Sequence, residues 1–150
     1  MEFVRLNESN VEEYIEYLEH AFSLEPDMMC AESVDKDEIR ARVKDGFYNN
    51  TTSVLAMEGG RVIGRIEYHF YGCMQDGCKM AYVDWVYVLP EFRHRGVARQ
   101  LFKEFESDCK QNGIDQYYLI IAENPDADKF YHSFEKAELS RVPLLRKYLK

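Results

Sequence analysis

Residues 81–103 of this 150-residue chain read AYVDWVYVLPEFRHRGVARQLFK. The opening run of β-branched and aromatic residues is typical of a buried β-strand, which Pro90 ends. A short cationic loop then closes on Gly96, and Phe102 and Phe105 follow at helical spacing. A helix that begins at such a loop presents unpaired backbone N–H groups and the positive end of its dipole. The stretch therefore predicts a strand, loop and helix that bind a phosphate or pyrophosphate.

The loop contains the pattern Arg93-x-x-Gly96-x-Ala98. Glycine lets a ligand approach the backbone closely because it has no Cβ. In this setting the pattern resembles the pyrophosphate-binding signature of the GNAT superfamily, N-acetyltransferases that use acetyl-coenzyme A. An ordinary strand-to-helix turn with solvated arginines is the alternative interpretation. The glycine fingerprint of dinucleotide-binding proteins, G-x-G-x-x-G, is absent from the sequence.

Length and composition indicate a single domain that spans residues 1–150. The chain is 46% hydrophobic and 14% aromatic, which favours a packed core over disorder. No apolar run approaches the roughly 18 residues of a membrane span, and the N-terminus lacks the apolar core of an export signal. We therefore expect a cytoplasmic protein without a membrane partner.

The cysteines and histidines show no pattern of a metal or redox site. We expect reduced thiols at Cys30, Cys73, Cys78 and Cys109, because no C-x-x-C pair occurs. A disulfide between Cys73 and Cys78, which flank a predicted turn, is the alternative. No His or Cys spacing typical of metal ligands is found, so no metal is expected.

Charge is distributed unevenly along the chain. The net charge is −8, yet residues 1–38 alone carry −10, because their twelve acidic side chains face only Arg5 and Lys36. Such a surface disfavours nucleic acid as a partner. A solvated acidic helix is the simpler interpretation, and an acidic wall that attracts a cationic acceptor is the functional alternative.

Hydrophobic periodicity and turn residues divide the chain into alternating elements. The predicted strands span 2–6, 52–57, 61–70, 80–89, 117–122 and 141–148, and the predicted helices span 11–22, 35–47, 96–111 and 125–134. The fifth strand is expected to be buried on both faces, and Pro143 places the last at an edge. This order is that of the GNAT fold. The resemblance implies an α/β (α+β) fold, with a mixed, mostly antiparallel central sheet flanked by helices and splayed between its fourth and fifth strands.

The resemblance also implies where the cofactor binds. The pantetheine arm is expected along the main chain of the fourth strand, at Val86, Tyr87 and Val88. The pyrophosphate is expected on the loop and first helical turn, at Arg93, His94, Arg95, Gly96, Val97, Ala98 and Arg99. Asn124 is expected to bond the pantetheine, and Tyr131 to approach the thioester sulfur. One departure from the family pattern is Glu135, which replaces a helix-ending glycine.

Acetyl transfer to an amine needs a base and an acid, because an alkylammonium cannot attack a thioester before it loses a proton. Asp84 resembles the acidic residue that many family members place on the fourth strand and is the leading base, with Glu67 as the substitute. Tyr131, with an unperturbed pKa of about 10, can protonate the leaving thiolate. A structural role is the alternative for each residue, Asp84 by bonding a neighbouring backbone or pairing with Arg65, and Tyr131 as part of the core. Trp85 is expected in the core, on the strand face opposite Asp84.

The sequence thus predicts an N-acetyltransferase that uses acetyl-coenzyme A as co-substrate and acts through a ternary complex. The acceptor is a primary amine, on a small molecule or a protein, and a cationic one is favoured. A non-catalytic acyl-coenzyme A sensor or regulatory module is the alternative. A homodimer is implied by resemblance alone, and the sequence does not identify the acceptor.

Overall fold

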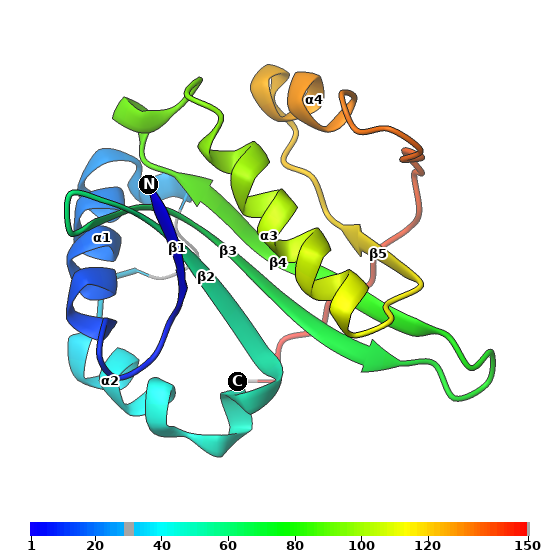
Figure 1. Cartoon of the computed structure of the whole chain (residues 1–150), viewed down its shortest axis with the longest axis horizontal. Coiled ribbons are helices and arrows are strands. Elements are labelled where there is room, and N and C mark those ends of the chain that lie inside the picture. The colour runs from blue at the N-terminus through cyan, green and yellow to red at the C-terminus, as the bar shows by residue number, and fades with distance from the viewer. Residues whose placement is uncertain (29–31, 150) are drawn as a thin grey trace. The chain divides into compact units, whose positions relative to one another are not determined.

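A computed structural model of the chain describes residues 1–28 and 32–149, so Cys30 lies outside the described residues (Figure 1). The chain forms two units, Met1–Leu119 and Ile120–Lys150, and each is described by itself. The first unit contains β1 (Glu2–Arg5), α1 (Val11–Leu24), α2 (Lys36–Lys44), β2 (Thr51–Glu58), β3 (Arg61–Gly72), β4 (Lys79–Val88), α3 (Val97–Gln111) and β5 (Gln116–Leu119). Short 3₁₀ helices at Pro26–Met28, Gly46–Asn50 and Pro90–Phe92 join some of these elements, and the second unit contains α4 (Pro125–Tyr131).

The five strands of the first unit form one sheet in the order β1-β2-β3-β4-β5. All neighbours are antiparallel except β4 and β5, which are parallel. β2 and β3 are joined by a tight turn at Gly59 and Gly60, whose φ angles of 59° and 77° lie in the left-handed region that glycine tolerates. The predicted mixed, mostly antiparallel sheet flanked by helices is confirmed.

Helices cover both faces of this sheet (Figure 1). On one face α1 buries Ile15 and Ala21 in a cluster that includes Leu55 of β2. On the other, α3 buries its apolar stripe, and the ring of Phe105 lies 4.7 Å from that of Tyr68 on β3. Fully burying one such side chain stabilises the fold by roughly 1.5–3 kcal/mol. The sheet is therefore a fixed frame for side chains that project from its strands.

An irregularity in β4 changes which side chains share a face. Glu67 of β3 pairs with Trp85, whereas the next residue, Tyr68, pairs with Val83, so Asp84 is the extra residue of a β-bulge. As a result Asp84 and Trp85 both line the same pocket. The expectation that Trp85 faces away from Asp84 is wrong, because strict alternation fails at a bulge.

The pairing of β4 with β5 is short. It runs from Met80 with Gln116 to Val83 with Leu119, where β5 ends. The predicted fifth strand extended to residue 122 and was expected to be buried on both faces; instead Tyr118 is 49% exposed. An edge strand has a neighbour on one side only, which an apolar run in the sequence does not reveal. Beyond Val83, β4 has no strand partner on the β5 side among the described residues.

The second unit begins with a well-capped helix. Asn124 accepts a hydrogen bond through Oδ1 from the N–H of Ala127 at 2.9 Å, and Pro125 occupies the first turn, as predicted. The predicted strand at 141–148 is wrong, because residues 137–149 have no regular secondary structure. A strand requires a partner for its backbone, and Pro143 lacks a donor for such pairing. No described helix combines the length and apolar character needed to cross a bilayer.

Candidate active site

The loop before α3 has the geometry of an anion site. We call residues 93–96 the anion loop. His94 and Gly96 have φ angles of 58° and 78°, in the left-handed region. Among the described residues, the backbone N–H groups of His94 through Ala98 donate no hydrogen bond. Such N–H groups at a helix N-terminus provide a cradle for a phosphate.

Gly96 is required by backbone conformation rather than by crowding within the protein. A Cβ built on Gly96 would meet no atom within 4 Å, whereas its φ of 78° is one that side chains with a Cβ rarely adopt. The open space beside Gly96 is consistent with close approach of a ligand, which stays a prediction.

The arginines of the anion loop are held by carboxylates. Arg93 donates through Nε to the carbonyl of Val88 at 3.0 Å, and its guanidinium pairs with Glu25 at the end of α1. Arg95 pairs with Glu58 at 3.0 Å. These contacts fix the loop's shape and leave its backbone groups as the predicted ligands of the pyrophosphate.

The three β4 residues predicted to bind pantetheine differ in their main-chain partners. The carbonyl of Val88 accepts from Arg93, and that of Tyr87 accepts from the buried hydroxyl of Tyr17 at 3.0 Å. In the described part of the chain, no side chain bonds to the main chain of Val86. Val86 pairs with Ile66 of β3, and its contact with pantetheine stays a prediction.

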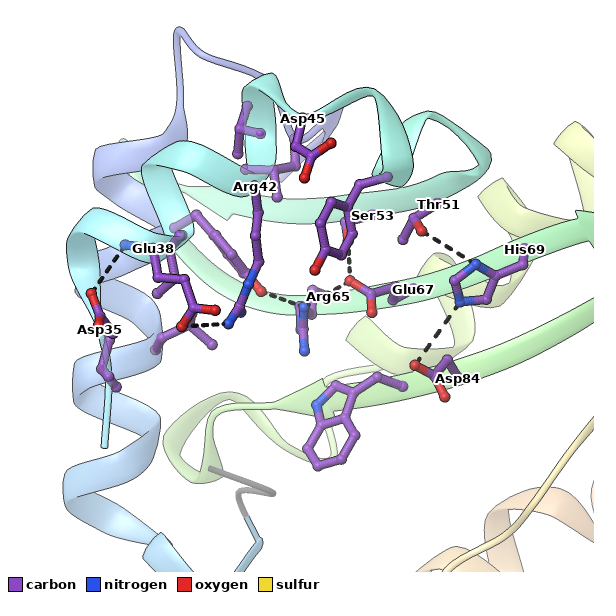
Figure 2. A pocket seen from close by; sticks show the side chains of 18 of the residues that line it. Asp35, Glu38, Arg42, Asp45, Thr51, Ser53, Arg65, Glu67, His69 and Asp84 are labelled. Carbon is purple, nitrogen blue, oxygen red and sulfur yellow. Dashed lines mark hydrogen bonds and ion pairs between the residues drawn. The ribbon is translucent and has the colours of Figure 1, made fainter. Parts of the chain in front are cut away.

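A pocket of about 680 Å³ opens beside β4 and lies within the first unit (Figure 2). We call it the sheet pocket. Its floor is formed by β2, β3 and β4, and its wall by α1, α2 and the segment after α2. Five of its lining residues are acidic and two are arginines: Asp35, Glu38, Asp45, Glu67, Asp84, Arg42 and Arg65. Two carboxylates on the floor, Glu67 and Asp84, are the bases that the sequence proposed, and the fold brings them together.

Glu67 is held by two donors. Ser53 donates through Oγ to its Oε2 at 2.5 Å, and Arg65 donates to the same oxygen at 3.1 Å (Figure 2). Arg65 also bonds to the hydroxyl of Tyr14, a residue of α1 whose pKa is raised by burial. The alternative in which Asp84 pairs with Arg65 is not found, since Arg65 lies against Glu67 on its own strand.

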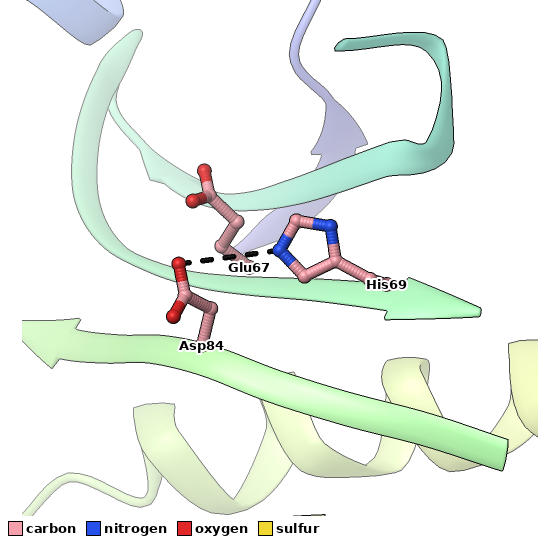
Figure 3. Close-up of side chains that lie close together, drawn as sticks. All are labelled: Glu67, His69 and Asp84. Carbon is pink, nitrogen blue, oxygen red and sulfur yellow. Dashed lines mark ion pairs between the residues drawn. The ribbon is translucent and has the colours of Figure 1, made fainter. Parts of the chain in front are cut away.

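Asp84 instead faces a histidine that sequence reasoning missed. Nε2 of His69 lies 4.0 Å from Oδ2 of Asp84 (Figure 3), and Nδ1 lies 3.3 Å from Oγ1 of Thr51 (Figure 2). His69 follows Glu67 by two residues on β3, so both side chains project from one face of the sheet. The spacing of Glu67 and His69 could be read from the sequence. The strand register that places Asp84 beside these two residues could not.

The two remaining predicted site residues belong to the second unit. Asn124 and Tyr131 lie at opposite ends of α4, and the Asn124 side-chain oxygen is already used as the helix cap. Tyr131 packs edge-on against Phe130 and Phe134, with ring centroids at 5.1 and 5.6 Å. Burial raises the pKa of Tyr131 to about 12. Its hydroxyl therefore stays protonated at neutral pH, as an acid must, and its role stays a prediction.

Two of the acidic residues near the N-terminus form ion pairs between helices. Glu12 and Glu19 of α1 pair with Arg40 and Lys36 of α2, at 2.7 Å in each case. These exposed pairs each contribute little to stability, yet they reduce the local charge. Asp35 and Glu38 of this acidic segment line the sheet pocket, so the acidic wall and the solvated face both stay predictions.

The described cysteines are free thiols. Cys73 and Cys78 flank the β3–β4 turn, and Cys109 lies on the buried stripe of α3, where burial raises its thiol pKa to about 12.

Comparison with protein-family models matches residues 10–135 to the acetyltransferase (GNAT) family. A search of curated protein sequences finds no significant match.

Solved structures with the same fold include three acetyltransferases. An aminoglycoside acetyltransferase from an uncultured soil metagenomic sample, in complex with sisomicin, has a TM-score of 0.81 and 15% identity over 99% of this chain and 96% of that one. Aminoglycoside N-acetyltransferase AAC(6')-Iy, in complex with CoA, has a TM-score of 0.74 and 21% identity over 97% and 93%. A ribosomal-protein-alanine N-acetyltransferase from Brucella melitensis biovar Abortus 2308 has a TM-score of 0.73 and 16% identity over 97% and 98%. At these identities the likeness establishes the fold.

Proposed function

The chain belongs to the GNAT acetyltransferase family and is an acyltransferase, and we propose that it transfers the acetyl group of acetyl-coenzyme A to a primary amine. The observation that carries this proposal is the position of Asp84. It is the first residue of β4 beyond the last β4–β5 pair, and its side chain lines the sheet pocket. A thioester lying along β4 and an amine in the pocket would therefore meet at Asp84.

The cofactor is assigned to the side of β4 that faces β5, whereas the amine is assigned to the sheet pocket. Its pyrophosphate binds the N–H groups of the anion loop and of the first turn of α3, and its pantetheine arm runs along β4, where Val86 offers main-chain groups. Asn124 and Tyr131 are assigned to the same cofactor by family resemblance. The CoA-bound aminoglycoside N-acetyltransferase, which shares the fold, supports coenzyme A as the cofactor.

The proposed chemistry combines the position of Asp84 with the role that family resemblance gives to Tyr131. Asp84 takes a proton from the acceptor's ammonium, and the neutral nitrogen attacks the thioester carbonyl carbon. A backbone N–H of β4 stabilises the oxyanion, and the carbon–sulfur bond breaks as Tyr131 protonates the leaving thiolate. The nitrogen then gives up its second proton, which restores the Tyr131 hydroxyl and leaves a neutral amide. Glu67, held by Ser53 and Arg65, stabilises the ammonium before it loses its proton and is the substitute for the base.

The acceptor is proposed to be a cationic amine. Carboxylates outnumber cations in the lining of the sheet pocket, which favours a positively charged ligand. Structural neighbours include enzymes for aminoglycosides and for a ribosomal-protein alanine, so both a small molecule and a protein amine fit the fold.

A screen of amines with acetyl-coenzyme A, read by release of free thiol, tests the proposal. Polyamines, amino sugars, amino acids and peptides with a free amino terminus form the panel. Amine-dependent thiol release, with one acetyl group found on the product by mass spectrometry, is the expected result. Tight binding of acetyl-coenzyme A without turnover for any amine would instead support a sensor or regulatory module.

A further inference from the structure

Three metal-ligating side chains meet on the floor of the sheet pocket (Figure 3). One donor atom from each of Glu67, His69 and Asp84 lies within 4.8 Å of the other two. We propose that these residues bind a divalent transition-metal ion such as Zn²⁺, which occupies the place of the acceptor's ammonium and inhibits the enzyme reversibly. Metal binding itself does not depend on the proposed function; the inhibition rests on it.

The distances fit one ion after a small adjustment. Bonds from Zn²⁺ to imidazole nitrogen or carboxylate oxygen are about 2.0–2.2 Å, so two donors on one ion lie at most about 4.4 Å apart. The His69 to Asp84 pair, at 4.0 Å, is already inside this limit. The Asp84 side chain is 48% exposed at a bulge, so it is free to rotate toward the other donors.

The donors are also oriented from behind, as metal ligands usually are. Oγ1 of Thr51 contacts Nδ1 of His69. In the tautomer with the proton on Nδ1, this N–H donates a hydrogen bond to Thr51, and Nε2 keeps the lone pair that a metal requires. Ser53 and Arg65 hold one oxygen of Glu67, Oε2, which leaves Oε1 to bind the ion. Each of the two β3 ligands therefore has a partner that fixes its direction.

The donor set selects among ions. One imidazole and two carboxylates suit Zn²⁺ and Co²⁺, whereas Mg²⁺ and Ca²⁺ prefer oxygen ligands alone. Three protein ligands also leave coordination positions open toward the pocket, which water fills. The Arg65 cation beside Glu67 weakens the attraction for a metal, so we expect reversible binding rather than a permanent structural ion.

Competition with the acceptor follows from the position of the cluster. Asp84 and Glu67 are the carboxylates that the proposed mechanism uses to receive the ammonium. A dication bound to both would occupy that place and remove the base. The anion loop and the pyrophosphate site are separate from it, so binding of acetyl-coenzyme A should be unaffected.

Calorimetric titration of the full chain with Zn²⁺, and the visible spectrum of the Co²⁺ form, test the site without any substrate. We expect one ion per chain in the wild type. His69→Gln and Asp84→Asn should each weaken binding at least 10-fold and alter the Co²⁺ spectrum. His20→Gln is the matched control, because His20 pairs with Glu91 away from the cluster. Circular dichroism checks that each variant is folded.

The thiols of Cys73 and Cys78, which flank the β3–β4 turn, provide a competing site for Zn²⁺. Binding that survives in His69→Gln and is lost in the Cys73→Ser, Cys78→Ser double variant would overturn the proposal, as would absence of binding to the wild type. If an amine substrate is found, Zn²⁺ should raise its KM without changing that of acetyl-coenzyme A. If excess amine does not relieve the inhibition, the proposal that Zn²⁺ occupies the place of the ammonium is wrong. Failure to find any substrate would leave the titration result standing, so the two proposals fail separately.

Discussion

Glu25, the residue that follows α1, accepts hydrogen bonds from the guanidinium of Arg93, the first residue of the anion loop. The same carboxylate accepts from the hydroxyl of Tyr87 at 2.7 Å. The Arg93 guanidinium also lies 5.3 Å from the centroid of the Tyr87 ring. The end of α1, the strand β4 and the anion loop are therefore joined through one carboxylate, which the sequence did not single out.

Replacing Glu25 by Gln should destabilise this junction. The hydrogen bonds from Arg93 and Tyr87 hold the pKa of Glu25 below its ordinary value of 4.5. A lowered carboxyl pKa stabilises the fold at neutral pH, and this contribution is lost as the pH falls through the folded-state pKa. We expect the free energy of unfolding to fall by about 1 kcal/mol at pH 7, a modest change because the pair is partly exposed. Urea denaturation measures it, and the difference from wild type should shrink at acidic pH. Glu104→Gln, on the exposed side of α3, is the control.

Replacing Gly96 by Val should weaken binding of acetyl-coenzyme A at least 10-fold. A left-handed backbone is unfavourable for a β-branched residue, so the variant distorts the loop, and the added side chain blocks approach of the pyrophosphate. Calorimetry on the folded variant measures the affinity. Gly77→Val is the matched control, since Gly77 has a φ of 68° and equally open surroundings, in the β3–β4 turn. Equal affinity in the Gly96 variant and the wild type would place the cofactor elsewhere.

Replacing Tyr131 by Phe should lower kcat by roughly 10-fold to 10⁴-fold while KM and stability change little. The substitution removes the hydroxyl and keeps the ring that packs against Phe130 and Phe134. Burial raises the Tyr131 pKa to about 12, so the hydroxyl stays protonated through the usual assay range. Deprotonation of Tyr131 should therefore cause no fall in rate within that range. Tyr117→Phe, which removes a hydroxyl bonded to Glu106, is the control. Wild-type turnover in the Tyr131 variant, with chemistry rate-limiting, would exclude Tyr131 as the acid.

The elements that hydrophobic spacing specifies locally were predictable from the sequence. α3 forms where its apolar stripe and Gly96 indicated, and the β2–β3 turn forms at Gly59 and Gly60. Errors occur where an element depends on a distant partner. β5 ends at Leu119, and residues 137–149 form no strand, because pairing is decided by neighbours that a local pattern does not contain.

The candidate site was predictable in its residue types and not in its contacts. Glu67 and Asp84 were identified as acids on neighbouring strands, but only the register and the bulge bring them together beside His69. A single extra residue reverses the face of every side chain beyond it, which is why Trp85 was assigned to the wrong face. Arg65, considered as an alternative partner of Asp84, instead pairs with Glu67, two residues along its own strand.

The last prediction separates the two candidate bases. If Asp84 takes the proton from the ammonium, Asp84→Asn keeps the shape of the side chain and the affinity for acetyl-coenzyme A, but abolishes the rise of rate with pH on the acidic side of the profile. Glu67→Gln should keep that rise and increase the KM of the amine, because Glu67 is held by Ser53 and Arg65 to receive a cation. Profiles of kcat/KM against pH for both variants and the wild type measure the effect. A wild-type profile in Asp84→Asn, together with loss of the acidic limb in Glu67→Gln, would assign the base to Glu67.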